Sequence, residues 1–84
     1  MNDIWKQKAL RTIEDIFREQ FFDEHLCVTE NTTPEDIDEW DSLAQVNLLA
    51  AIEEAFNIRF TADDMAVIDS VATLLNTMVE RGAK

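Results

Sequence analysis

The chain has 84 residues, with 7 basic and 18 acidic side chains and a formal net charge of −11. Such a surface repels nucleic acids and anionic membranes, because it cannot neutralise phosphate groups, and it favours partners with basic patches. A chain of this length is expected to form a single domain, residues 1–84. One glycine and one proline are too few for a fold rich in tight turns, so we expect an all-α fold, a small four-helix bundle.

The cellular location is predicted from what the sequence lacks. The N-terminus has no apolar signal region, and no apolar run approaches the length of a membrane span. Cys27 is the only cysteine, so no internal disulfide can form, which is typical of a reducing compartment. Between Leu26 and Val28 it is expected to be a small buried side chain. We therefore predict a soluble, cytoplasmic monomer.

The first helix is expected to begin near Asp3, as a possible cap, and to run to about Phe21. Its apolar residues recur at helical spacing and form one stripe: Trp5, Ala9, Ile13, Ile16 and Phe17. Most of the positive charge also lies on this helix, at Lys6, Lys8, Arg11 and Arg18.

Residues 22–41 lose this periodicity, and a connection of this length inside a small domain tends to contain short structure. Thr33 followed by Pro34 and two acidic residues predicts a short helical turn there. The apolar residues of the segment are expected to pin it to the core: Leu26, Val28, Ile37 and Trp40.

The second helix, predicted over residues 42–56, has more apolar surface than a core face needs. One face carries Leu48, Leu49, Ile52 and Phe56. Leu43, Val46 and Ala50 form a second strip, with Ser42 at its near end and Glu53 and Glu54 at its far end. This strip either packs under the long loop, beneath Trp40, or forms a docking face for a basic partner.

Two further helices complete the predicted bundle. A short one opens at Thr61, where Thr61 and Asp64 have the spacing of a capping box, and ends around Met65. The last follows Ser70 as its cap, with Gly82 where a C-terminal cap belongs. Its apolar residues keep the helical repeat: Val71, Leu74, Leu75, Met78 and Val79.

Ser42 is the residue with the clearest chemical potential. A hydroxyl at a helix N-terminus has free backbone amides behind it, which suits a negatively charged group. Its surroundings do not suit catalysis, because no Gly-x-Ser-x-Gly elbow is present and His25 would have to reach it from a loop. Asp36, Asp38 and Asp41 do not complete a calcium loop, and no spacing suits zinc. We expect no metal site and no enzyme.

Taken together, these segments resemble the acyl carrier protein family over essentially the whole chain. The family's Asp-Ser-Leu motif stands in Glu39-Trp40-Asp41-Ser42-Leu43 and is followed by Ile52-Glu53-Glu54-Ala55-Phe56. The family register continues through Phe60-Thr61-Ala62-Asp63-Asp64, Ile68 and the helix after Ser70.

The resemblance implies that a phosphopantetheinyl transferase attaches 4′-phosphopantetheine to Ser42 from coenzyme A with a magnesium ion, which would make the chain a phosphoprotein. The thiol of the arm would hold an acyl group as a thioester. Asp41 is the residue expected to support attachment, through the metal or the transferase. Acyl-processing enzymes with basic patches would dock on Leu43, Val46, Ala50, Glu53 and Glu54.

Two departures from the family pattern concern the pathway. Carriers of bacterial fatty-acid synthesis usually have acids where this chain has Ala44 and Asn47, and a small residue in place of Trp40. The Trp-Asp-Ser-Leu form is more similar to carriers of specialised pathways, such as polyketide, modified-sugar or lipopolysaccharide synthesis. The alternatives are an aminoacyl or peptidyl carrier, an unmodified acidic helical adaptor and, third, a small hydrolase.

Overall fold

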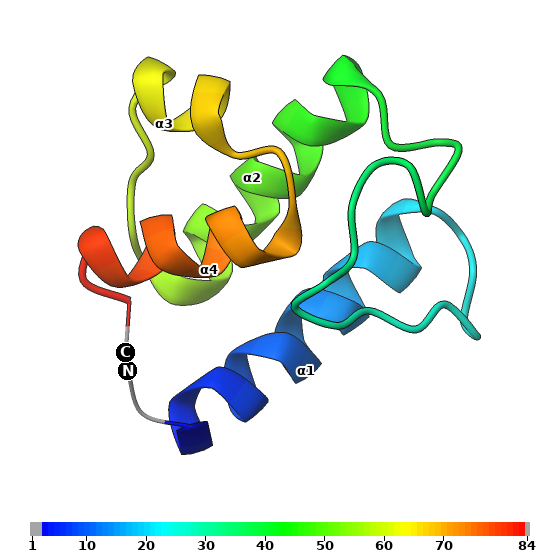
Figure 1. Cartoon of the computed structure of the whole chain (residues 1–84), viewed down its shortest axis with the longest axis horizontal. Coiled ribbons are helices and arrows are strands. Elements are labelled where there is room, and N and C mark those ends of the chain that lie inside the picture. The colour runs from blue at the N-terminus through cyan, green and yellow to red at the C-terminus, as the bar shows by residue number, and fades with distance from the viewer. Residues whose placement is uncertain (1–2, 84) are drawn as a thin grey trace.

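The computed structural model describes residues 3–83 and contains four helices. They are α1 (Asp3–Gln20), α2 (Ser42–Phe56), α3 (Ala62–Val67) and α4 (Val71–Glu80). No strand occurs within the described residues, which confirms the all-α prediction (Figure 1). α1 packs against α2, and the long segment between them forms wide loops on the right of the view. None of these helices combines the length and apolar character needed to cross a membrane.

The core forms where the apolar stripes of three helices meet. On α1 the predicted stripe is correct, with Ala9, Ile13 and Phe17 buried, although the side chain of Asp3 lies outside the described residues. On α2 the predicted core face is also correct, and Phe56 is half-buried. The largest fully buried side chains are Phe17, Ile13, Leu48, Leu49, Ile52, Leu74, Leu75, Met78 and Val71.

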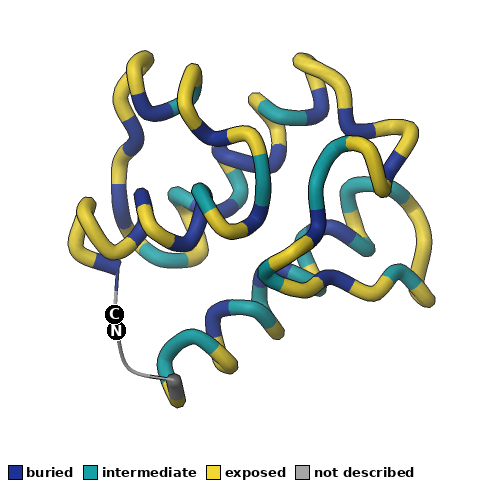
Figure 2. The backbone as a smooth tube through the Cα atoms, viewed as in Figure 1, coloured by how far each residue is buried: buried dark blue, intermediate teal, exposed yellow. Residues whose placement is uncertain are grey.

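The segment between α1 and α2 is pinned to this core as predicted. Val28, Ile37 and Trp40 are buried, and the Trp40 ring stands edge-on to Phe17 with the ring centroids 5.1 Å apart. The backbone N–H of Val71 donates to the carbonyl of Thr32 at 3.0 Å, which fastens the segment to α4. Figure 2 shows its buried positions alternating with exposed ones.

The short turn predicted after Thr33 is present: the Asp36 N–H donates to the Thr33 carbonyl at 2.9 Å and the Ile37 N–H donates to the Pro34 carbonyl at 3.4 Å, and the turn does not extend into a longer helix. The Asp36 carboxylate accepts the Thr33 N–H at 3.0 Å, and the chain then leads Ile37 into the core before a second helical turn can form. Cys27 was predicted to be buried, and this was wrong: it is exposed, whereas the neighbouring Val28 packs into the core.

The helix ends follow local chemistry closely. Thr61 and Asp64 form the predicted capping box of α3, which ends two residues later than expected, and Ser70 caps α4. Gly82, at φ 89°, ends α4 with two backbone hydrogen bonds. Ala83 donates to Met78 at 2.9 Å and Gly82 to Val79 at 3.1 Å, the bonds of a Schellman motif.

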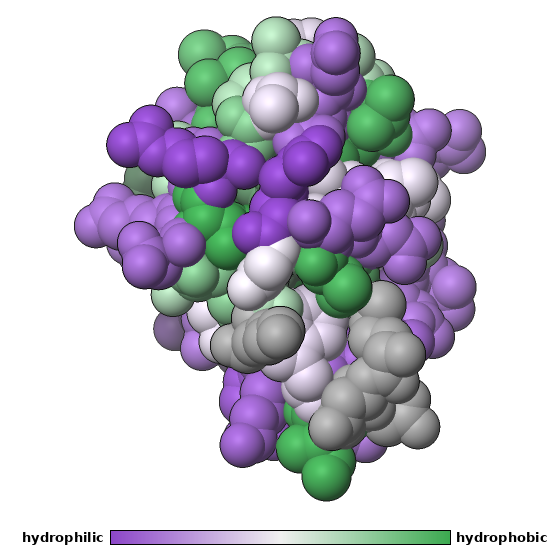
Figure 3. Space-filling view, turned by 90° about the vertical axis from the view of Figure 1, so that its left-hand side faces the viewer, coloured by the Kyte–Doolittle hydropathy of each residue, from purple (hydrophilic) through white to green (hydrophobic). Residues whose placement is uncertain are grey.

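The surface on the left of Figure 1 has only separated apolar patches (Figure 3).

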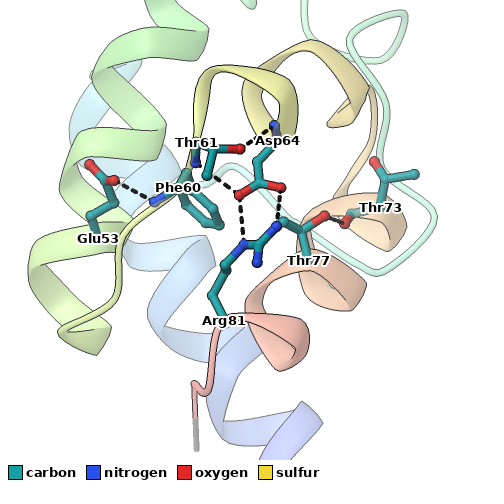
Figure 4. A network of polar contacts seen from close by, with 7 residues as sticks. All are labelled: Glu53, Phe60, Thr61, Asp64, Thr73, Thr77 and Arg81. Carbon is teal, nitrogen blue, oxygen red and sulfur yellow. Dashed lines mark hydrogen bonds and ion pairs between the residues drawn. The ribbon is translucent and has the colours of Figure 1, made fainter.

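α3 is fastened to the end of α4 by one ion pair, formed by Asp64 and Arg81. The Arg81 guanidinium donates two hydrogen bonds of 2.7 Å to the Asp64 carboxylate, whose Oδ2 also accepts the Thr61 N–H (Figure 4). These bonds favour the charged carboxylate and hold the pKa of Asp64 far below its usual range. The same carboxylate thus completes the cap of α3 and anchors α4 to it.

Candidate functional site at the N-terminus of α2

Asp41, not Ser42, caps α2. Its backbone is extended, with φ −105° and ψ −172°, and its carboxylate accepts the Ala44 N–H at 2.8 Å. The Asp41 carbonyl also accepts the N–H of Gln45 at 2.9 Å. An aspartate in this position satisfies one of the free amides of the first turn. Ser42 is therefore the first residue inside the helix, and its side chain does not cap the helix.

The Ser42 side chain is exposed at the positive end of the α2 dipole. Within residues 3–83 its hydroxyl has no hydrogen-bond partner, so it does not serve the fold there. No acidic side chain occupies the first turn of α2, which leaves the free amides beyond the cap available to an added anion. A phosphate bonded to this oxygen would be placed favourably.

Gln45 links Trp40, two residues before this serine in the chain, to Ile68, and sequence reasoning missed it. Its side-chain carbonyl accepts the Trp40 indole N–H at 2.6 Å, and its amide donates to the Ile68 carbonyl at 2.7 Å. One side chain of α2 thereby joins the end of the long loop to the α3–α4 connection. A glutamine one helical turn after the cap, with a tryptophan five residues earlier, was the available signal.

An open hollow of about 340 Å³ lies directly beside Ser42. Apolar side chains of Trp40, Met65 and Ile68 contribute to its walls, together with polar groups of Gln45 and Asp69. Within the described residues, no group of three His, Cys, Asp or Glu side chains is arranged to hold a metal ion. The hollow has room for part of a flexible group attached at the serine.

The outer strip of α2 is solvent-exposed. Leu43 is 73% exposed and Val46 53%, and Ala50 is exposed beside them. The alternative in which this strip packs beneath Trp40 and the loop was therefore wrong. Its apolar surface is available to a partner.

The two glutamates at the far end of this strip differ. Glu54 is exposed, whereas Glu53 is half-buried and accepts the Phe60 N–H at 2.7 Å, which secures the chain after α2 (Figure 4). Ala44 is also less available than expected, being only 8% exposed because it faces the core side of the helix, while Asn47 is exposed. An acid at residue 44 would thus face a largely buried environment.

His25 lies away from this arrangement. It is exposed in the segment after α1, where its imidazole approaches the Glu24 carboxylate at 3.7 Å. Among the described side chains no contact joins it to Ser42. Among the described residues, His25 is therefore not placed to act as a general base for Ser42.

Comparison with known proteins places this arrangement in a class. No family model and no curated protein matches the chain. Among solved structures, it is similar to the solution NMR structure of the holo acyl carrier protein from Geobacter metallireducens, with a TM-score of 0.77 and 30% sequence identity. The match covers 87% of this chain and 84% of that protein.

The fold and this match define a small helical carrier protein, which is not an enzyme. The chain belongs to the acyl carrier protein family. The family prediction made from the Asp-Ser-Leu motif and its flanking segments is therefore confirmed.

Proposed function

We propose that Ser42 is the attachment site of 4′-phosphopantetheine and that residues 1–84 act as one acyl carrier domain in the cytoplasm. The observation that carries this proposal is the exposed Ser42 hydroxyl at the first residue of α2, without a partner in the described structure. The structural neighbour is a holo protein, which supports the presence of such a group in the family.

The residues present fit this group. The Ser42 Oγ would lose its proton and bond the phosphorus of coenzyme A that carries the pantetheine, while the pyrophosphate P–O bond of coenzyme A breaks and adenosine 3′,5′-bisphosphate leaves. The resulting phosphodiester would lie beside the free amides of α2. Trp40, Met65 and Ile68 would offer apolar contacts to the part of the arm nearest the serine. When bound, the arm supplies a terminal thiol that holds an acyl group as a thioester.

Partner recognition is proposed to occur on the outer strip of α2. Leu43, Val46 and Ala50 supply apolar surface, and Glu54 with the part of Glu53 that remains exposed supplies negative charge. Asp41 stands next to Ser42 and would meet the phosphopantetheinyl transferase or its metal. Acyl-processing enzymes with basic patches would approach the same face, because complementary charge steers encounter.

The pathway is proposed to be a specialised one, such as polyketide, modified-sugar or lipopolysaccharide synthesis, in preference to general fatty-acid synthesis. Trp40 supports this choice, because its buried ring and its bond to Gln45 make it part of the site architecture. Asn47 supports it by leaving the exposed face of α2 without a charge near Ser42.

The test is intact-mass spectrometry after incubation with coenzyme A, magnesium and a broad-specificity phosphopantetheinyl transferase. Wild type should gain the mass of one phosphopantetheine, and Ser42→Ala should gain nothing. Ser70→Ala is the matched control, because Ser70 is the other serine of the chain and serves as the cap of α4. That variant should still be modified.

Equal modification of Ser42→Ala would show that another residue carries the group. No modification of wild type would instead favour the unmodified adaptor. An aminoacyl or peptidyl carrier would be modified at Ser42 in the same way, and it is distinguished by the mass of the cargo on protein from the native host.

A further inference from the structure

Phe22, directly after α1, combines an unfavourable backbone with a solvent-exposed ring. Its φ is 53°, in the left-handed region, and its side chain is 96% exposed, the highest fraction among the exposed large hydrophobic residues of the described chain. Bulky residues are rare in this backbone region, since the side chain crowds the neighbouring carbonyl. Because the ring is not buried in the folded chain, no burial of apolar surface offsets the cost of this backbone conformation.

The other helix ends show how unusual this choice is. The Asp23 N–H donates to the Arg18 carbonyl at 3.0 Å, so α1 ends in the same type of turn as α4. The corresponding left-handed residue is Gly82 after α4 and Asn57 after α2, both of residue types that tolerate this conformation. A phenylalanine at this position is explained neither by the turn nor by the core.

The surroundings of Phe22 are shaped for contact with a partner. It lines a hollow of about 330 Å³, shared with Ile16 and Ala51, and a second hollow of about 570 Å³, shared with Arg18 and His25. The exposed carboxylates of Glu19, Asp23 and Glu24 line these hollows, and the Arg18 guanidinium is already paired with Glu14 at 3.2 Å. An apolar ring with net negative charge around it fits an apolar pocket with a basic rim.

The position of Ala51 connects this feature with the serine. Ala51 follows Ser42 by nine residues in α2, about 14 Å along the axis at 1.5 Å per residue and about half a turn around it. The arc between them carries the exposed residues Val46, Ala50 and Asn47. A typical protein interface covers about 800 Å² on each partner, which is wide enough to include both places. An enzyme whose contact runs from Ser42 across this exposed arc of α2 would therefore also reach Phe22.

We propose that Phe22 is a docking anchor for enzymes that act on Ser42, beginning with the phosphopantetheinyl transferase of the native host. The ring enters an apolar pocket on the enzyme, and Glu19, Asp23 and Glu24 meet the basic side chains around it. A second copy of this chain is a poorer occupant, because the same carboxylates would face one another across a symmetric contact. This inference rests on the proposed modification of Ser42.

The experiment measures KM and kcat of the host transferase for wild type, Phe22→Gly and Phe22→Asn, with melting temperatures of all three. Both substitutions suit the left-handed backbone, so neither should lower the melting temperature. Loss of a central aromatic anchor should raise KM at least about tenfold with little change in kcat. Val79→Ser is the matched control, because it removes an exposed apolar side chain from α4, whose C-terminal end lies on the left of Figure 1 whereas α1 ends on the right, and it should leave KM unchanged.

An unchanged KM for both Phe22 variants, with normal modification of wild type, would overturn the anchor and leave the carrier function standing. Failure of the transferase to modify wild type would overturn both. A wild-type dimer in sedimentation that Phe22→Gly dissociates would assign the ring to self-association and overturn the proposal.

Discussion

Asp41 and Ser42 are adjacent but differ in role: the Asp41 side chain caps α2, and the Ser42 side chain is exposed to solvent. The Asp41 carboxylate satisfies the Ala44 N–H and fixes the start of α2, which leaves the Ser42 hydroxyl at the helix entrance without a structural role in the described fold. Serine could itself have been the cap, in which case its hydroxyl would have been turned toward the backbone. The placement of an exposed nucleophilic oxygen thus depends on the residue before it.

This division allows the cap and the charge of Asp41 to be tested separately. Asp41→Ala should lower the free energy of unfolding by about 1 kcal/mol, whereas Asp41→Asn should keep it within a few tenths, since asparagine caps equally well. If the charge supports attachment, both variants should be modified slowly by the transferase. Chemical denaturation and a time course of mass gain measure the two effects, and wild-type rates for Asp41→Asn would remove Asp41 from the proposed site.

At the scale of the element, α2 presents one face to the core and another to solvent. Leu48, Leu49 and Ile52 are buried, while Leu43 and Val46 remain outside. An exposed apolar strip on a helix next to an exposed serine is a surface that a partner can cover, and the glutamates at its far end would orient a partner with basic side chains.

Val46→Asp tests this strip. Because Val46 is 53% exposed, the change should alter the free energy of unfolding by no more than about 0.5 kcal/mol, while the transferase should modify the variant more slowly. Ala72→Asp on the exposed side of α4 is the charge-matched control and should be modified at the wild-type rate. A melting point that collapses with Val46→Asp would show that the residue is part of the core.

α3 and α4 depend on the Asp64–Arg81 pair, and this dependence should vary with pH. The folded pKa of Asp64 lies well below its usual value of 3.8, so its stabilising effect is complete above that value and is lost as pH falls toward the folded pKa. Wild type should exceed Asp64→Asn in unfolding free energy by a constant amount above about pH 5, and the difference should shrink below about pH 4.

Denaturant titrations from neutral pH to about pH 2 measure this difference. Asp63→Asn is the control, because Asp63 is the exposed neighbour in the first turn of α3. A difference between wild type and Asp64→Asn that stays constant down to about pH 2 would contradict the role given to this ion pair.

For the whole molecule, the dominant property is the charge of −11 on a body with a radius of gyration of 11.7 Å. Self-repulsion among the five exposed acids directly before α2 opposes the compact state. These acids are Glu35, Asp36, Asp38, Glu39 and Asp41. Raising sodium chloride from about 10 mM to about 0.2 M should increase the melting temperature by a few degrees. A flat or falling titration would mean that repulsion among these acids does not limit stability.

The sequence was most informative where structure is decided within a few residues. The caps at Thr61 and Ser70, the turn at Gly82 and the motif around Ser42 depend on neighbours in the chain. Cys27 was misjudged, and the burial of Ala44 and the hydrogen bond of Glu53 to the Phe60 N–H were not predicted, because exposure and bonding at these positions are set by residues packed from elsewhere. Phe22 was taken only as the start of a loop, since a left-handed backbone at a phenylalanine leaves no sequence signal.

The central claim, that this chain is a carrier modified at Ser42, is tested most directly on protein made by its native host. Intact-mass spectrometry followed by peptide mapping should find the mass of one phosphopantetheine, with or without an acyl cargo, on the peptide that contains Ser42. Protein that carries only its unmodified mass while the host's other carriers are modified, or the added mass on a different peptide, would contradict the account.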